Sequence, residues 1–229
     1  MLNLISTPIG NLGDISQRAL DALSNADLVI CEDTRKTGFL LKHFEITKPM
    51  LTFRVDNEKR ALPRILRILE EGKNVVLVTD SGTPGISDPG FLVVRAALAN
   101  GIEVNAVPGP SAFVMALTLS GLPTTSFTFR GFPPHKSGPR KRFFEIDVLS
   151  PHTLIFYESP YRLQASMQDA LAVFGDRRAA CANDLTKKFE QVKRGILSEL
   201  LEFYNSEPPR GEYTIVIEGY PKDRANPPG

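Results

Sequence analysis

The sequence predicts an α/β protein with a largely parallel sheet. Short apolar runs, of the length of buried strands, alternate with segments whose apolar residues recur at helical spacing. Gly/Pro-rich turns follow several of the apolar runs, as loops follow strands. With 229 residues, the chain is long enough for two compact α/β domains.

The first half has the clearer pattern. Strands are expected at residues 2–6, 28–31, 75–79 and 104–107. Helices are expected at residues 16–26, 34–44, 57–71, 89–100 and 110–121. Ser16 is a typical N-cap, whereas Pro63 leaves the boundary of the third helix open. Pro110 and Gly121 suit the first turn and the end of the fifth helix, and we place the domain boundary after Gly121.

The second domain, residues 122–229, begins with a change of texture. From Thr125 on, alternating aromatic residues predict a half-buried strand. Further strands are expected at residues 153–157, 179–182 and 213–218, with helices at 160–174 and 197–204. Residues 221–229 are polar and Pro-rich, so we expect a short disordered tail.

Composition excludes several classes of protein. A net charge of +1 argues against nucleic-acid binding through overall basicity, so any RNA contact must be local. Cys31 and Cys181 form no CxxC or Cys/His cluster, which argues against a disulfide framework and a zinc site. The chain starts without a basic secretory signal, and no apolar run approaches the ~20 residues of a membrane span. We therefore expect a cytoplasmic protein.

Three Gly/Pro-rich loops, residues 7–13, 80–90 and 107–112, follow expected strands. Parallel sheets bind ligands at the carboxyl ends of their strands, and small or cyclic residues leave room there for a preformed site. The loops contain neither GxGxxG nor a P-loop, and no Lys or Arg, so a neutral or cationic ligand such as S-adenosylmethionine fits better than a polyphosphate. The candidate cofactor-binding residues are Pro8, Gly10, Asp80, Gly82, Thr83, Pro84, Ile86, Ser87, Asp88, Pro108, Gly109, Pro110, Ser111 and Ala112.

Methyl transfer from such a donor needs close positioning of the acceptor, helped by a base, and requires no metal. The candidate catalytic residues are Glu32, Asp33, Asp88, Glu158 and Lys187. A structural alternative exists for two of them. Asp33 suits a helix cap, and Lys187 a solvated charge.

A basic strip spans residues 130–142, with five Lys/Arg, no acidic residue, and aromatic rings for stacking. The alternative is a solvated linker between domains. Two further arginines, Arg35 and Arg162, lie a few residues after Glu32-Asp33 and Glu158. The candidate RNA-binding residues are therefore Arg35, Arg130, Lys136, Arg140, Lys141, Arg142 and Arg162.

Several motifs occur in order along nearly the whole chain. They are Ser6-Thr-Pro-Ile-Gly-Asn-Leu-Gly, Cys31-Glu-Asp-Thr-Arg, Asp80-Ser-Gly-Thr-Pro-Gly-Ile-Ser-Asp-Pro-Gly, Val107-Pro-Gly-Pro-Ser-Ala, Ser120-Gly-Leu-Pro-Thr, Tyr157-Glu-Ser-Pro, Leu185-Thr-Lys and Gly211-Glu-Tyr. Together they resemble the bacterial small-subunit (16S) ribosomal RNA ribose 2′-O-methyltransferases, which modify a cytidine in the decoding centre and belong to the tetrapyrrole-methylase-like superfamily.

The resemblance implies two α/β domains of the class III methyltransferase type, with S-adenosyl-L-methionine in the cleft between them. It further implies a homodimer acting on 16S ribosomal RNA or the small ribosomal subunit. Two alternatives stay open: methylation of a tetrapyrrole or other small molecule, which the same donor loops would serve, and a non-catalytic RNA- or nucleotide-binding module.

Overall fold

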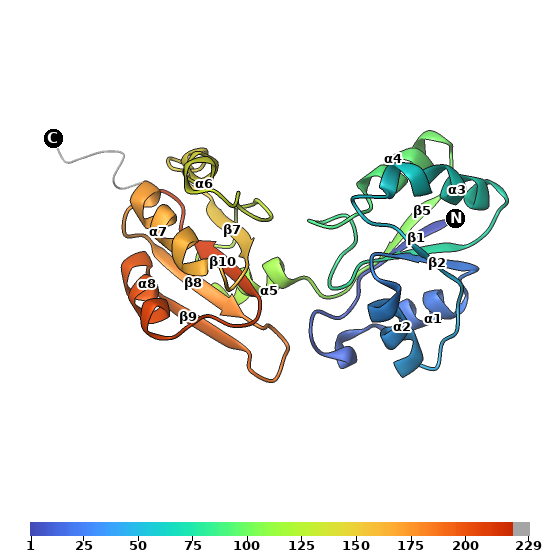
Figure 1. Ribbon diagram of the computed structural model, residues 1–229, viewed down its shortest axis with the longest axis horizontal. Helices are drawn as coiled ribbons and strands as arrows, with labels where there is room; N and C mark the ends of the chain where they lie inside the picture. Colours follow the sequence, from blue (N-terminus) through green and yellow to red (C-terminus); the bar gives the residue numbers. More distant parts are fainter. Residues whose placement is uncertain (222–229) are drawn as a thin grey trace. The chain divides into compact units, whose positions relative to one another are not determined.

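The computed structural model describes residues 1–221, and residues 222–229, which cover most of the expected tail, lie outside the described residues. The chain divides into two compact units, Met1–Ser111 and a second one that starts at Ala112. Each unit contains its own sheet and hydrophobic core (Figure 1).

The first unit is built on a five-stranded sheet in the order β3-β2-β4-β1-β5, in which all neighbours run parallel. Its strands are β1 (Leu2–Ile5), β2 (Leu28–Cys31), β3 (Met50–Thr52), β4 (Val75–Val78) and β5 (Val104–Val107). The central strand β4 is buried at all four residues, as its uninterrupted apolar sequence predicts. The edge strand β3 is short and partly exposed, and no strand was predicted there.

Helices cover both faces of this sheet (Figure 1). They are α1 (Gln17–Ser24), α2 (Thr34–His43), α3 (Glu58–Glu70) and α4 (Phe91–Ala99), with a short 3-10 helix, η1 (Leu12–Asp14), after β1. The hydrophobic cluster on one face contains Leu23 and Leu41 from α1 and α2. The cluster on the other face contains Ile65 and Val93 from α3 and α4. Ser16 caps α1 as predicted, and α3 continues through Pro63.

The order of strands indicates where a ligand would bind in the first unit. From β1 the chain continues to α1 on one face, whereas from the neighbouring β4 it continues to α4 on the opposite face. Open α/β sheets bind ligands where neighbouring connections diverge in this way, outside the carboxyl ends of the strands. The loops after β1 and β4 begin at that point.

The second unit contains a mixed five-stranded sheet in the order β6-β7-β10-β8-β9. Only β6 and β7 run parallel, and the other neighbouring strands of this sheet are antiparallel. The predicted, largely parallel sheet is that of the first unit. The strands are β6 (Phe127–Phe129), β7 (Thr153–Glu158), β8 (Arg178–Asn183), β9 (Gln191–Ile196) and β10 (Tyr213–Ile217). The helices are α5 (Ala112–Ser120), α6 (Ser137–Glu145), α7 (Leu163–Phe174) and α8 (Leu197–Ser206).

Helix α5 contacts β7, β8, β9 and β10, and it therefore clusters with the second unit. Our sequence-based boundary falls after this helix, at Gly121. The opposite face of the sheet packs against α6, α7 and α8 through residues such as Phe144, Met167 and Leu200. Strand β9 and helix α6 were not predicted.

Two further results concern residues 1–221 as a whole. No helix in this part of the chain combines the length and apolar character that a membrane crossing requires. Nor do its His, Cys, Asp and Glu residues form a group of three or more that could hold a metal ion.

Candidate active site

The three Gly/Pro-rich loops meet at the carboxyl ends of β1, β4 and β5. Thr7 and Gly82 exchange two backbone hydrogen bonds, with N···O distances of 2.9 and 3.1 Å. Beside this pair, the hydroxyl oxygens of Ser6 and Thr83 lie 3.1 Å apart. The loops after β1 and β4 therefore form one continuous structure.

The third loop approaches the first most closely at Gly109. A Cβ atom at this position would lie 2.9 Å from the Ser6 Cβ and 3.3 Å from the Ser6 carbonyl oxygen. In the second loop, Gly82 has a φ angle of +87°, in the left-handed region that favours glycine. Both glycines are therefore required by the way in which the loops pack.

Most of the predicted donor-binding residues lie at the surface of these loops. Gly82 and Pro84 are buried. The half-buried or exposed ones are Pro8, Gly10, Asp80, Thr83, Ile86, Ser87, Asp88, Pro108, Gly109, Pro110, Ser111 and Ala112. Apart from Ile86, which is 42% exposed, the accessible surface consists mainly of backbone and small or acidic side chains.

Acidic residues gather at the ends of β2 and β4. Glu32 accepts hydrogen bonds from the Thr79 hydroxyl and, at 3.4 Å, from the Asp80 amide. Asp80 in turn accepts from the Asp33 amide at 3.2 Å and forms an ion pair with Lys36 at 2.9 Å. The sheet edge next to the loops is therefore rich in carboxylates, as a cationic ligand would need.

Asp33 caps α2 and binds Arg35. Its carboxylate accepts from the Arg35 backbone amide at 2.9 Å and pairs with the Arg35 guanidinium at 2.6 Å. These hydrogen bonds hold the pKa of Asp33 well below its usual range, so this carboxylate is a weak base. Asp33 therefore caps the helix as predicted, and Arg35 lies close enough to pair with it.

Asp88 differs from the other carboxylates. Burial raises the pKa of Asp88 to about 6, and the negative charges of Glu32 and Asp80 add to the shift, while the Thr79 hydroxyl opposes it. A carboxyl group with this pKa is largely ionised at neutral pH and still accepts a proton readily. Among the candidate bases, Asp88 is the best matched to general-base catalysis.

In the second unit, Glu158 is held by its neighbours. Its side chain is completely buried and forms a 2.6 Å ion pair with Arg162. It also accepts hydrogen bonds from the Ser159 amide at 2.8 Å and from the Ser166 hydroxyl. Arg162 further donates to the Pro133 carbonyl oxygen at 3.1 Å. This network braces the β7–α7 connection, which favours positioning roles for Glu158 and Arg162 over catalysis and RNA contact.

Lys187 also has partners. Its ammonium group contacts Asp184 at 2.8 Å and Glu212 at 2.5 Å. Burial lowers the pKa of Lys187, but the hydrogen bonds to Asp184 and Glu212 outweigh it, and the net shift is upward. Lys187 is therefore protonated at neutral pH and unsuited to act as a base.

Residues 137–142 of the basic strip belong to α6, and some of its cations are wholly or partly buried, which corrects the interpretation of residues 130–142 as a single RNA-binding strip. Arg140 is 3% exposed and binds Asp169 of α7 at 2.7 Å, because a buried guanidinium needs a paired anion. Arg130 forms an ion pair with Asp147 at 2.9 Å. Lys136 and Arg142 are exposed. Lys141 is half-buried and lies 3.7 Å from Asp169, but its side chain is still 44% exposed, so these three cations remain accessible.

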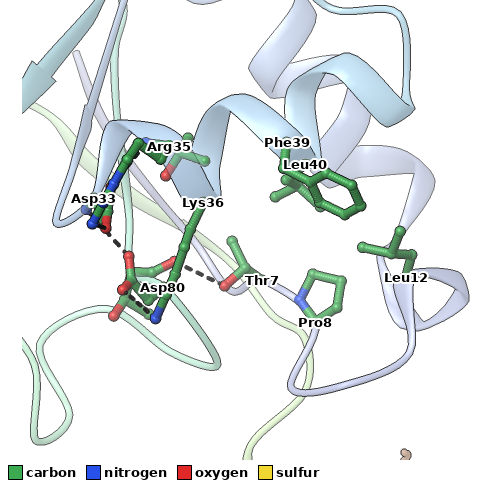
Figure 2. Close-up of a pocket in the computed structure, with 11 residues that line it drawn as sticks. Thr7, Pro8, Leu12, Asp33, Arg35, Lys36, Phe39, Leu40 and Asp80 are labelled. Atoms are coloured by element: carbon green, nitrogen blue, oxygen red, sulfur yellow. Dashed lines mark hydrogen bonds and ion pairs between the residues drawn. The ribbon is translucent and has the colours of Figure 1, made fainter.

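A pocket of about 520 Å³ lies within the first unit, between the loop after β1 and helix α2. Figure 2 shows an apolar end, where Phe39 and Leu40 face Pro8 and Leu12. Toward the other end lie the charged groups, which are Asp33, Arg35, Lys36 and Asp80. The pocket is thus amphipathic and adjoins the Thr7–Gly82 junction.

Lys36, Phe39 and Leu12 line this pocket but were not predicted from the sequence as site residues. A signal was present for Phe39, because the buried residues of α2 are Thr37, Leu40 and Leu41, and a helical projection places Phe39 off that face.

Comparison with known proteins places this architecture in a defined class. The family model of tetrapyrrole (corrin/porphyrin) methylases matches residues 1–201. Among solved structures, the crystal structure of diphthine synthase superposes with a TM-score of 0.70 at 17% sequence identity, covering 95% of this chain and 89% of that one. The protein is an S-adenosylmethionine-dependent methyltransferase.

Curated relatives match nearly the whole chain. The ribosomal RNA small subunit methyltransferase I of Xylella fastidiosa is 46% identical over 221 residues, which cover 95% of this chain and 81% of the relative. The protein of the same name from Thermotoga maritima is 42% identical over 218 residues, covering 95% and 98%. The chain belongs to the tetrapyrrole methylase family, in the group that these ribosomal RNA small subunit methyltransferases I represent.

Proposed function

We propose that the protein methylates 16S ribosomal RNA in the small ribosomal subunit, at the ribose 2′-hydroxyl of a cytidine in the decoding centre. The observation that carries this proposal is the similarity, at 42–46% identity over nearly the whole chain, to proteins named for small-subunit ribosomal RNA methylation. The cytidine and its ribose hydroxyl come from the motif resemblance.

We assign donor binding to the three loops after β1, β4 and β5. Their residues fit S-adenosylmethionine because they contain no Lys or Arg and adjoin the carboxylates of Glu32, Asp80 and Asp88. When bound, S-adenosylmethionine supplies an activated methyl group on a positively charged sulfur. Gly82 and Gly109 let the three loops pack closely against one another, which fixes the shape of this site before a ligand binds.

We assign proton removal to Asp88. A ribose hydroxyl is a weak acid, so a carboxylate within hydrogen-bond reach that accepts its proton assists attack on the methyl group. The pKa of about 6 keeps Asp88 ionised at neutral pH. The neighbouring Thr79–Glu32 hydrogen bond keeps a second negative charge near it and so maintains its basicity.

We assign RNA phosphate contacts to Lys136, Lys141 and Arg142, which α6 and the residue before it present on the second unit. Arg35 is a further candidate because its side chain is 89% exposed. A homodimer and a cytoplasmic location remain predictions. Analytical ultracentrifugation of the full chain tests the dimer.

The experiment that tests the proposed function offers labelled S-adenosylmethionine together with small subunits from a strain that lacks this modification. We expect label in the RNA of small subunits, and none in large subunits or in ribosomal proteins. Label only in a tetrapyrrole supplied in parallel would favour the small-molecule alternative. Donor binding without any transfer would favour the non-catalytic one.

A further inference from the structure

The pocket beside α2 is separate from most of the proposed donor site. It shares Thr7, Pro8, Leu12 and Asp80 with the donor loops, but residues 82–88 and 108–112 do not line it. It opens instead toward α2, the helix that follows β2. A ligand in this pocket therefore lies beside the donor loops without occupying them.

Two kinds of side chain line the pocket. Phe39 presents an aromatic ring that is 66% exposed and faces Pro8 and Leu12 at the apolar end of the pocket (Figure 2). The ammonium group of Lys36 and the guanidinium group of Arg35 lie near the opposite end, where Asp80 and Asp33 balance their charge. A flat ring for stacking, cations for phosphate and carboxylates for amino or hydroxyl groups are the contacts that a nucleotide uses.

The balance of charges favours a nucleotide over a tetrapyrrole. The pocket contains as many carboxylates as cations, and each cation is already paired with one of them. A macrocycle with several carboxylates would add several uncompensated negative charges to the pocket. A single nucleotide would add only about one negative charge, that of its phosphate. The volume of about 520 Å³ is also within the range of roughly 300–1,000 Å³ of small-ligand sites.

We propose that the pocket between α2 and the loop after β1 receives the RNA nucleotide that accepts the methyl group, with its base against Phe39 and its phosphate toward Lys36. This inference rests on the proposed function, since it names where the acceptor of that reaction binds. The nucleotide must leave its stack to enter the pocket, which enzymes acting on nucleic acids commonly require. Asp80 lines the pocket and begins the loop that contains Asp88. In this proposal the ribose of the nucleotide lies at the Asp80 side of the pocket and extends toward Asp88 and the donor.

A binding experiment tests the pocket without any catalysis. Cytidine 5′-monophosphate is titrated into the full chain with labelled leucine methyl groups, and we expect the resonances of Leu12 and Leu40 to shift. Phe39→Ala should weaken this binding about tenfold, because stacking on an aromatic ring is lost. Phe39→Trp should retain it. Unshifted Leu12 and Leu40 resonances in the wild type, or equal affinity in Phe39→Ala, would overturn the proposal.

Kinetics with small subunits provide a second, separate readout. We expect Phe39→Ala to raise KM for the subunits about tenfold, with the affinity for S-adenosylmethionine unchanged in calorimetry. The matched control is Leu98→Ala on α4, which removes an apolar side chain that is 61% exposed and outside the pocket, and it should leave both values unchanged. Equal KM in Phe39→Ala and wild type would overturn the pocket assignment alone.

The two proposals fail in different ways. If the wild type transfers no methyl group to RNA, the proposed function fails, and the nucleotide titration still decides whether the pocket binds a nucleotide. Because Phe39 is exposed, its replacement should not unfold the protein, and thermal unfolding of Phe39→Ala checks this. A loss of donor affinity in folded Phe39→Ala would instead assign the pocket to the donor and overturn the inference.

Discussion

Replacing Gly109 by alanine tests the packing of the donor loops most sharply. The added methyl group would lie 2.9 Å from the Ser6 Cβ, whereas carbon atoms in contact prefer about 3.5–4.0 Å. One of the two loops must therefore move by roughly 0.6 Å or more. Ser6 is poorly placed to move, because it is 4% exposed and its hydroxyl contacts Thr83.

The size of the effect follows from this clash. Overpacking of this kind costs about 1–3 kcal/mol, and a change of 1.4 kcal/mol in binding is about tenfold in affinity. We expect calorimetry to show that Gly109→Ala binds S-adenosylmethionine about 5- to 100-fold more weakly than wild type. The melting temperature should fall by roughly 3–10 °C.

The matched control is Gly38→Ala in α2, where the new Cβ would meet only the mobile Met50 side-chain terminus at 3.6 Å. Alanine is also a better helix former than glycine by about 1 kcal/mol, so this variant should be slightly more stable and bind the donor normally. If folded Gly109→Ala binds the donor as tightly as Gly38→Ala does, the loop after β5 does not contribute to the donor site.

Four further predictions concern the charged groups. The rate of methyl transfer should rise with pH through about 6, where Asp88 loses its proton, and Asp88→Asn should abolish that dependence; an unchanged profile in Asp88→Asn would exclude it as the base. The pKa of Asp88 is higher in the folded than in the unfolded protein, so its ionisation makes the folded state less stable as pH rises from about 4 to 6. Asp88→Asn removes this destabilising charge and should therefore increase the melting temperature more at pH 8 than at pH 4.5. Arg140→Met should destabilise the second unit by about 3–5 kcal/mol in denaturant unfolding, since Asp169 loses its buried partner, and a change below about 1 kcal/mol would contradict a bracing role. Lys136→Gln and Arg142→Gln should leave stability unchanged and each reduce the salt dependence of RNA binding by about one phosphate contact; a salt dependence equal to wild type would remove them from the RNA-binding surface.

Local sequence patterns predicted the first sheet well. The bounds of β2 and β5 agree with the predicted ranges, and the capping residues Ser16 and Asp33 lie where their side chains indicated. These features depend on short-range effects, namely apolar runs for buried strands and side-chain oxygens at helix starts. They are visible without knowledge of the tertiary structure.

The missed elements depend on partners far away in the sequence. Strand β9 reads Gln-Val-Lys-Arg-Gly-Ile, half polar, and pairs only with β8 as an edge strand. Helix α6 lies in a segment that composition alone describes as a basic strip. The guanidinium group of its Arg140 is buried and paired with Asp169, which lies 29 residues further along the chain. A sequence pattern cannot show that such a cation is neutralised.

The candidate site also combines features that the sequence predicts with features that depend on the tertiary structure. The three loops could be predicted because glycine and proline mark sharp turns after strands. The pocket beside α2 could not, because it depends on how Phe39 and Lys36 approach the loop after β1 in space. The pKa of Asp88 likewise follows from burial beside Glu32 and Asp80, which come together only in the folded sheet.

The central claim is that this protein methylates a ribose of small-subunit RNA, and nucleoside analysis of the product tests it most directly. Unmodified small subunits are incubated with the protein and isotopically labelled S-adenosylmethionine, and the 16S RNA is then digested and examined by mass spectrometry. We predict one labelled nucleoside, 2′-O-methylcytidine from the decoding centre. A labelled methyl group on a base, or RNA that stays unlabelled while the donor binds, would contradict the account.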